Sequence, residues 1–232
     1  MKALLSQWGI DYHPLDVEAQ PEQVDRLRAA GVPAVPALEH QGRFVHGWQP
    51  GAYAKLLGVQ MEAREILPPG QLEVRLDILL VFLEYLALEA GMGNMGLRHP
   101  GRDRDLRQLF YHTVRVAQAF VDCMEQGMLQ EAWLDEQAPA DMKDITAFRN
   151  YSGEVRLRLQ VWFALQKPAV YQGIAQTYYG PQGVHDLLER TVWHCAQHLR
   201  QITALLEEAG VLPPGSLPPL VLKGLPMPDA VW

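Results

Sequence analysis

Three histidines are the residues of this 232-residue chain whose types and spacing could do chemistry. His194 and His198 are four residues apart in the run WHCAQHLRQI, and His112 lies in FYHTVRV. A spacing of four in a helix places two side chains on one face, one turn apart, so that both imidazoles could reach one ion. Imidazole binds zinc, nickel, copper and iron, and three imidazole ligands leave a coordination position for water or substrate. The histidines therefore indicate a reactive metal centre.

The apolar pattern around the histidines predicts that all three face a core. Counting in threes and fours from Leu187 places His194 and His198 on one apolar stripe, and the same count from Leu109 places His112 on another. A buried imidazole without hydrogen bonds costs on the order of a few kcal/mol, and one shared metal would satisfy all three rings. The alternatives are a coincidental surface pair and core histidines bonded to carbonyls or carboxylates.

Four long segments with the apolar spacing of amphipathic helices must position these residues. They span residues 71–92, 103–127, 144–166 and 183–209. A shorter helical pattern runs from Pro168 to Tyr179. We expect a mainly α chain with a four-helix bundle over residues 71–210.

Residues 1–58 predict a separate small α/β unit. The expected order is helix, strand, helix, β-hairpin and helix. The segments are KALLSQWGI, YHPLDV, PEQVDRLRAAG, VPAVPALEH paired with FVHGW, and PGAYAKLLG. Residues 59–70, which end in Leu-Pro-Pro-Gly, form the expected linker. Residues 211–232 predict an irregular tail that packs on the bundle through Leu220, Val221, Leu222 and Trp232.

Composition narrows the class of protein. With 48% hydrophobic and 20% charged residues the chain can bury a core, and its net charge of -7 argues against a nucleic-acid partner. Its two cysteines, Cys123 and Cys195, have no disulfide-type spacing. The longest apolar run contains Glu84 and Glu89, and no secretory signal opens the chain. We therefore expect a cytoplasmic protein without a membrane span.

The segments DLRQLFYHTVRVAQAFVDCM and LLERTVWHCAQHLRQITALLEEAG resemble helices two and four of the DinB-like family. That family has a first histidine on helix two and an HxxxH followed by Arg and Gln on helix four; here Arg200 and Gln201 follow His198. The resemblance covers residues 70–210. It implies a four-helix bundle that holds zinc or nickel through His112, His194 and His198. Some relatives are thiol-dependent transferases or isomerases with glutathione-like cofactors, and others have no assigned reaction.

Residues 1–58 resemble a glutaredoxin-like domain, a thioredoxin-fold unit, most closely in GVPAVPAL. The resemblance makes Pro36, preceded by Val35, a candidate cis proline beside which a thiol binds, and makes Gly47 and Trp48 further candidate glutathione contacts. The family's first strand and CxxC motif would precede Met1. We therefore expect the start of the domain to lie upstream; the alternative is a remnant domain whose missing strand is replaced from elsewhere. Gln49 stands where the family has an aspartate.

Together the two resemblances imply a thiol-dependent, glutathione-type S-transferase or isomerase acting on a small electrophile. The alternative is a non-catalytic protein with a structural metal and an N-terminal unit that serves as a scaffold or dimerisation module. Homodimers are compatible with either function. Glu84 and Glu89 are further candidates as metal ligands or bases, and the alternative for them is a solvated helix face. Candidate pocket residues, for which packing is the alternative, are Tyr111, Tyr178, Tyr179 and Arg200.

Overall fold

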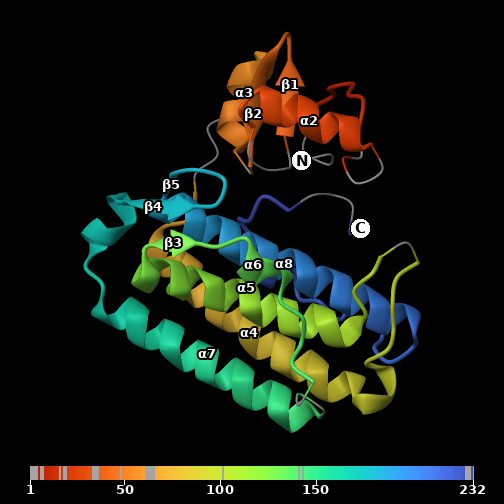
Figure 1. The fold of residues 1–232 in the computed structure, drawn as a ribbon. Coiled ribbons are helices and arrows are strands. Elements are labelled where there is room, and N and C mark those ends of the chain that lie inside the picture. Colours follow the sequence, from red (N-terminus) through yellow and green to blue (C-terminus); the bar gives the residue numbers. More distant parts are fainter. Residues whose placement is uncertain are drawn as a thin grey trace. The chain divides into compact units, whose positions relative to one another are not determined.

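The computed structural model describes residues 5, 8–15, 17, 20–32, 37–47, 49–60, 66–100, 102–140, 142, 144–227 and 231. These residues are mainly helical (Figure 1). The chain divides into two compact units, Met1–Glu65 with Pro228–Ala230 and Ile66–Met227 with Val231–Trp232. Within the described ranges, no helix combines the length and the apolar content needed to cross a membrane.

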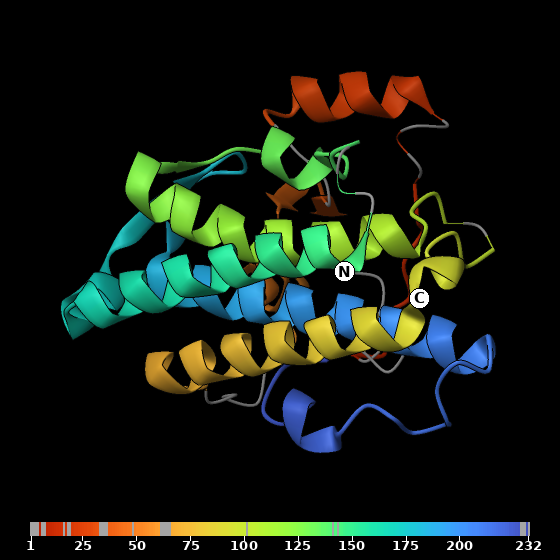
Figure 2. The ribbon, with the colours of Figure 1, turned by 90° about the horizontal axis from the view of Figure 1, so that it is seen from below.

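Four long helices form the larger unit where the apolar periodicity predicts them (Figure 2). They are α4 (Pro69–Ala90), α5 (Leu106–Gln126), α7 (Ile145–Leu165) and α8 (Val184–Glu208). Helices α5 and α4 each pack against both α8 and α7. The carboxylates of Asp105 and Asp144 cap α5 and α7 by accepting hydrogen bonds from the N–H groups of Gln108 and Ala147, both at 2.8 Å. The side-chain caps explain why these two helices begin where they do.

Short elements connect the long helices. After α5 the chain forms β3 (Met128–Leu129) and α6 (Ala132–Asp135), and a 3₁₀ turn at Pro168–Gln172 follows α7. The expected helical piece from Pro168 to Tyr179 is wrong beyond that turn, because Ile174–Thr177 form strand β4. β4 pairs in parallel with β3 and antiparallel with β5 (Gln182–Gly183), and its β-branched ends favour this extended pairing.

The bundle also buries a charged network between α5, α6 and α7. Arg115, whose side chain is 5% exposed, donates from NH1 to Asp122 at 3.0 Å and from Nε to Glu136 at 2.7 Å. Asp122 accepts a second bond from Arg158 NH1 at 2.6 Å. Charges this deeply buried are tolerated only when each is paired, so the network ties the three elements together.

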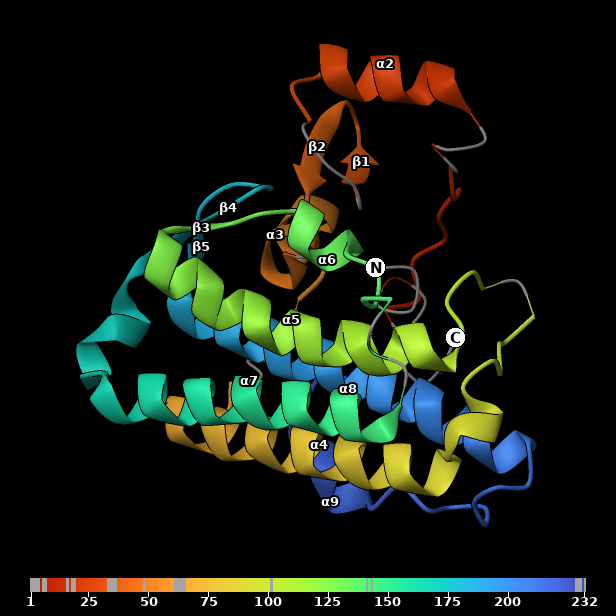
Figure 3. The same cartoon turned by 60° about the horizontal axis from the view of Figure 1, so that its bottom comes forward.

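The C-terminal segment lies on the bundle and is less irregular than expected. It contains the one-turn helix α9 (Pro219–Leu222), which lies beside α4 (Figure 3). Val221 is buried, but Leu220 is 69% exposed, so its predicted packing role is wrong. Consecutive residues of a helix point about 100° apart, and only one of these two can face α4. Trp232 lies outside the described residues.

The N-terminal unit contains α2 (Pro21–Ala29), the hairpin β1 (Ala37–His40) and β2 (Arg43–His46), and α3 (Pro50–Leu57). The hairpin turns at Gln41 and Gly42, whose φ values of 52° and 76° are those of a type I′ turn. Its core is formed by four buried side chains, Leu5, Leu38, Tyr53 and Leu56.

Two elements predicted for the start of the N-terminal unit are the strand YHPLDV and the first helix, KALLSQWGI. The strand predicted over YHPLDV is wrong for Tyr12–Leu15, which lie outside any strand with Tyr12 and Leu15 exposed. Pro14 in the middle of this segment has no N–H to give to a strand ladder. Most of the predicted first helix, KALLSQWGI, lies outside the described residues.

Candidate metal centre

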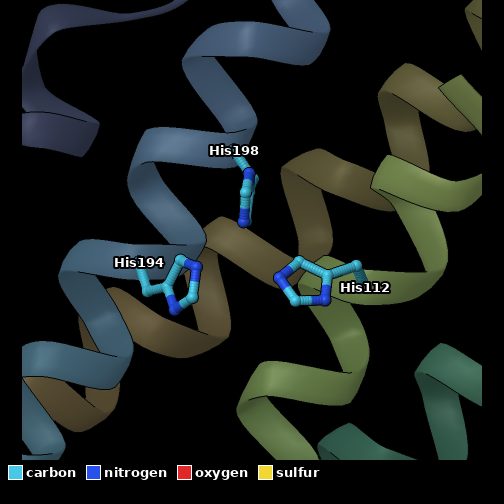
Figure 4. A group of neighbouring side chains, drawn as sticks. All are labelled: His112, His194 and His198. Carbon is cyan, nitrogen blue, oxygen red and sulfur yellow. The ribbon is translucent and has the colours of Figure 1, made fainter. Parts of the chain in front are cut away.

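The packing of α5 against α8 brings His112, His194 and His198 together. His112 comes from α5 and the other two from neighbouring turns of α8, and the three rings face a common point (Figure 4). The His112 ring centroid lies 4.8 Å from that of His198 and 5.4 Å from that of His194, and the two α8 rings are 4.7 Å apart. One nitrogen from each ring can be chosen so that all three lie within 4.8 Å of one another. This separation suits three ligands around one ion.

Among the residues that the structure describes, three buried ring nitrogens of the cluster lack the hydrogen bonds that core histidines need. His112 is 3% exposed and His198 is 7% exposed, while His194 is half-buried. Both ring nitrogens of His112 and Nε2 of His198 make no hydrogen bond to the described part of the chain. Each unsatisfied buried polar atom lowers the stability of the fold by about 1–3 kcal/mol. Three such atoms in one cluster therefore indicate a ligand that is shared by the rings. A metal ion would accept lone pairs from all three rings.

Gln201 holds the His198 ring in the orientation that a metal ligand requires. The Nδ1 atom of His198 lies 2.8 Å from Oε1 of Gln201, and Nε2 of Gln201 donates to the carbonyl oxygen of Val231 at 3.1 Å. Because an amide oxygen can only accept, His198 carries its proton on Nδ1 and turns the lone pair of Nε2 toward the cluster. Metal-bound histidines are commonly oriented by such a bond on the second nitrogen.

The surroundings of the three histidines keep their imidazoles unprotonated near neutral pH. Burial, together with the charges of His198 and Arg104, lowers the pKa of His112 to about 2 against an opposing effect of the Leu134 backbone. Burial also lowers the pKa of His198 to about 4, although its bond to Gln201 raises it, and lowers that of His194 well below 6.5. Metals bind the unprotonated imidazole, so near pH 7 all three rings are in the form a metal needs.

Two arginines that were not singled out from the sequence lie near the histidines. Arg190 and His194 line the same small hollow, which has a volume of about 20 Å³ and room for roughly one water. The guanidinium of Arg190 lies 4.4 Å from the Tyr179 ring centroid and donates to its hydroxyl. The charge of Arg104 lowers the pKa of all three histidines. Neither arginine is paired with a carboxylate of the described chain.

These arginines were missed for identifiable reasons. Arg104 belongs to the run RHPGRDRDLR, whose charges are typical of a solvated helix start. Arg190 lies four residues before His194, so the two side chains lie on the same face of α8. This spacing was the sequence signal that could have identified Arg190.

The carboxylate candidates do not join the histidines. Among the described residues, the metal-ligand group contains histidines alone. Glu84 instead accepts bonds from Ser152 at 2.9 Å and Arg156 at 3.3 Å between α4 and α7, and Glu89 is exposed. A facial triad of two histidines and a carboxylate is therefore not formed by this part of the chain.

The cysteines and tyrosines have packing contacts. Burial raises the pKa of the Cys123 thiol to about 11 and that of Cys195 to about 12, and each thiol donates weakly to a backbone carbonyl. Tyr111 donates to Glu136 at 3.2 Å and stacks on Tyr151. Neither cysteine is therefore a thiolate near neutral pH.

Acid is expected to destabilise the metal-free chain. The folded-state pKa values of His112 and His198 lie below the ordinary 6.5, so the unfolded chain binds more protons as the pH falls below about 6.5. The free energy of unfolding should then decrease by up to about 1.4 kcal/mol per pH unit for each ring until its folded-state pKa is reached, and these rings should contribute no slope above pH 7.

Urea unfolding of chelator-treated protein between pH 7.5 and 5 measures this slope. His112→Phe should flatten it, whereas His13→Gln, which removes an exposed histidine, should leave it unchanged. Equal slopes for His112→Phe and the unaltered chain would refute the expected role of burial.

Of the candidate thiol contacts in the N-terminal unit, only Gly47 lies in the described part of the chain. It is buried, with a φ of 71° that favours glycine. Val35, Pro36 and Trp48 lie outside the described residues. Comparisons of the chain with protein-family models, with curated proteins and with solved structures find no match.

Proposed function

We propose that His112, His194 and His198 hold one divalent metal ion, zinc or nickel, in a DinB-like bundle. The observation that supports this most strongly is the convergence of three neutral imidazoles, two of them almost fully buried, whose inward nitrogens lack hydrogen bonds. Gln201 adds the orienting contact expected behind a ligand histidine. Histidine-only coordination by three residues is the pattern of sites that keep an open position.

The open position gives this arrangement its chemistry. When bound, a zinc or nickel ion supplies a Lewis acid that lowers the pKa of an oxygen or sulfur ligand. Arg104 and Arg190 contribute positive charge beside it, which favours an anionic ligand such as a thiolate or carboxylate. The chain's own thiols are buried and protonated, so a reacting thiol must come from a small molecule.

We therefore propose a glutathione-type, thiol-dependent S-transferase or isomerase. In the transferase reaction the thiol loses its proton to solvent, and its sulfur forms a bond to the electrophilic carbon of a second substrate, such as an organic halide, as the carbon–halogen bond breaks and the halide leaves with the electron pair. The proposal extends to the N-terminal unit as a glutaredoxin-like domain, with Val35, Pro36, Gly47 and Trp48 as its thiol contacts. The fitting location for such a protein is the cytoplasm, where glutathione is reduced.

Turnover of glutathione with a panel of electrophiles tests the reaction. The zinc- or nickel-loaded full chain is expected to form thioether product, and His198→Ala should reduce kcat/KM at least about 100-fold by weakening the metal site. Arg190→Gln should reduce it about 10-fold, mainly through KM, because an arginine that binds an anion acts on the bound state.

His13→Gln serves as the matched control, since it removes an exposed histidine and should leave turnover unchanged. A chain that binds the metal but turns over no thiol with any electrophile would overturn the transferase assignment and leave the metal site standing.

One observation favours the non-catalytic alternative. His112 and His198 are almost inaccessible, and the hollow beside His194 has room for about one water. A metal enclosed in this way would serve to join α5 to α8, and the N-terminal unit would serve as a scaffold. Stoichiometric metal that stabilises the fold without turnover is the result that this alternative predicts.

A further inference from the structure

Helix α4 is apolar on its outer face as well as on the face it turns to the core. Its inner leucines, such as Leu72, Leu76 and Leu83, are at most 1% exposed. Five apolar residues lie on the opposite side. They are Val74, Ile78, Val81, Tyr85 and Leu88, with exposures of 61%, 43%, 45%, 44% and 50%. The outer face of a bundle helix is ordinarily polar, and a helix that is apolar all round is ordinarily buried.

The spacing of this outer stripe is that of a helix-pairing seam. From Val74 the steps are four, three, four and three residues, which is the alternation of the a and d positions of a heptad. A groove of about 390 Å³ between α4 and α7 adjoins the N-terminal end of the stripe, where Val74, Ile78 and Phe163 contribute to its lining. The exposed side chains of the stripe therefore suit knobs-into-holes packing against a second helix, with the adjoining groove as an additional contact.

We propose that α4 is the interface of a homodimer, in which the outer faces of two α4 helices pack antiparallel about a twofold axis that crosses the stripe between Val81 and Tyr85. This alignment pairs Ile78 with Leu88 and Val81 with Tyr85 across the axis. Val74, at the start of the stripe, lies beside the C-terminal end of α4 in the second copy, where Gly91 ends the helix. The same patch serves both copies, so the assembly closes at two chains.

The charges that flank the stripe fit this pairing. Glu89 is exposed and Arg75 is half-buried, with one N–H donating to the carbonyl oxygen of Leu220. The two residues occupy the same heptad position on the side away from α7, so the antiparallel pair places each Arg75 beside Glu89 of the second copy. On the side toward α7, Asp77 and Glu84 are already bound by Arg156 at 3.1 and 3.3 Å. The alternative parallel pair would set Glu84 against Glu89 of the second copy, which is repulsive.

Sedimentation of the full chain over a concentration series tests the dimer. We expect a species of twice 26.1 kDa for the unaltered chain. Val81→Glu, which places two carboxylates near the axis, should give a 26.1 kDa monomer with the same helical circular dichroism. Leu165→Glu changes an equally apolar residue of α7 that is 75% exposed and outside the stripe, and it should leave the dimer intact.

A charge exchange tests the register and does not depend on how Val81→Glu folds. Arg75→Glu should weaken the dimer about 10-fold, and Arg75→Glu combined with Glu89→Arg should restore it. A monomeric unaltered chain, or a dimer indifferent to both Val81→Glu and Arg75→Glu, would overturn the interface. Binding of a monomer to phosphatidylcholine vesicles that Val81→Glu abolishes would also overturn it, by assigning the stripe to a lipid surface.

Discussion

Replacing His198 with alanine is expected to abolish the zinc-dependent stabilisation of this chain. A ligand that binds only the folded state stabilises it by about 2.7 kcal/mol when its free concentration is 100 times its Kd. His198 is one of three converging ligands and the one whose ring is held by Gln201, so its loss should lower the affinity for zinc by more than 100-fold. Urea unfolding with chelator and with a small excess of zinc measures the difference.

Two further variants separate ligation from general destabilisation. Gln201→Ala removes the bond to Nδ1 but keeps all three rings, and it should weaken zinc binding about 10-fold while leaving one ion per chain. His13→Gln should behave like the unaltered chain. If His198→Ala is stabilised by zinc as strongly as the unaltered chain, the three histidines are not the binding site.

Helical periodicity predicted the bundle well because it reflects burial directly. The four long helices begin and end within a few residues of the predicted segments, since Asp105 and Asp144 cap α5 and α7 and glycines at 91 and 127 follow α4 and α5. The prediction was wrong where tertiary pairing decided the structure. Ile174–Thr177 became a strand because β3 and β5 lie on either side of it.

The candidate site was predictable for a different reason. Spacing alone places His194 and His198 on one face of a helix, but it cannot show that His112 of another helix lies near them. The position of His112 on the apolar stripe of α5 predicted that its ring faces the core as well. Arg104 lacked such a signal, and Arg190 offered only its four-residue spacing from His194, because the positions of both arginines beside the rings depend on how the elements of the bundle pack. The orienting contact of Gln201 likewise needs a three-dimensional structure.

Replacing Asp122 with alanine is expected to destabilise the fold by about 3–5 kcal/mol, which is a large part of the 5–15 kcal/mol typical of a domain. The carboxylate is 8% exposed and accepts bonds from Arg115 at 3.0 Å and Arg158 at 2.6 Å. Without it Arg115, itself 5% exposed, keeps a single acidic partner, Glu136. Urea unfolding at neutral pH measures the loss.

Asp77→Ala provides the matched control. Its carboxylate is also bound by an arginine, Arg156 at 3.1 Å, but it is 37% exposed, so its loss should cost at most about 1 kcal/mol. Similar losses for the two variants would show that burial of the α5 network does not govern its contribution. This network could not be predicted from the sequence, because Arg115 and Asp122 look like ordinary charged residues of an amphipathic helix, and only the three-dimensional structure shows their partners Glu136 and Arg158.

Calorimetric titration of the metal-free full chain, with any affinity tag removed, tests the metal site most directly. Zinc should bind at one ion per chain, and the variant in which His112, His194 and His198 are all alanine should bind none at the same concentration while retaining its helical circular dichroism. Absence of binding to the unaltered chain, or the same stoichiometry in the triple variant, would contradict a three-histidine metal centre.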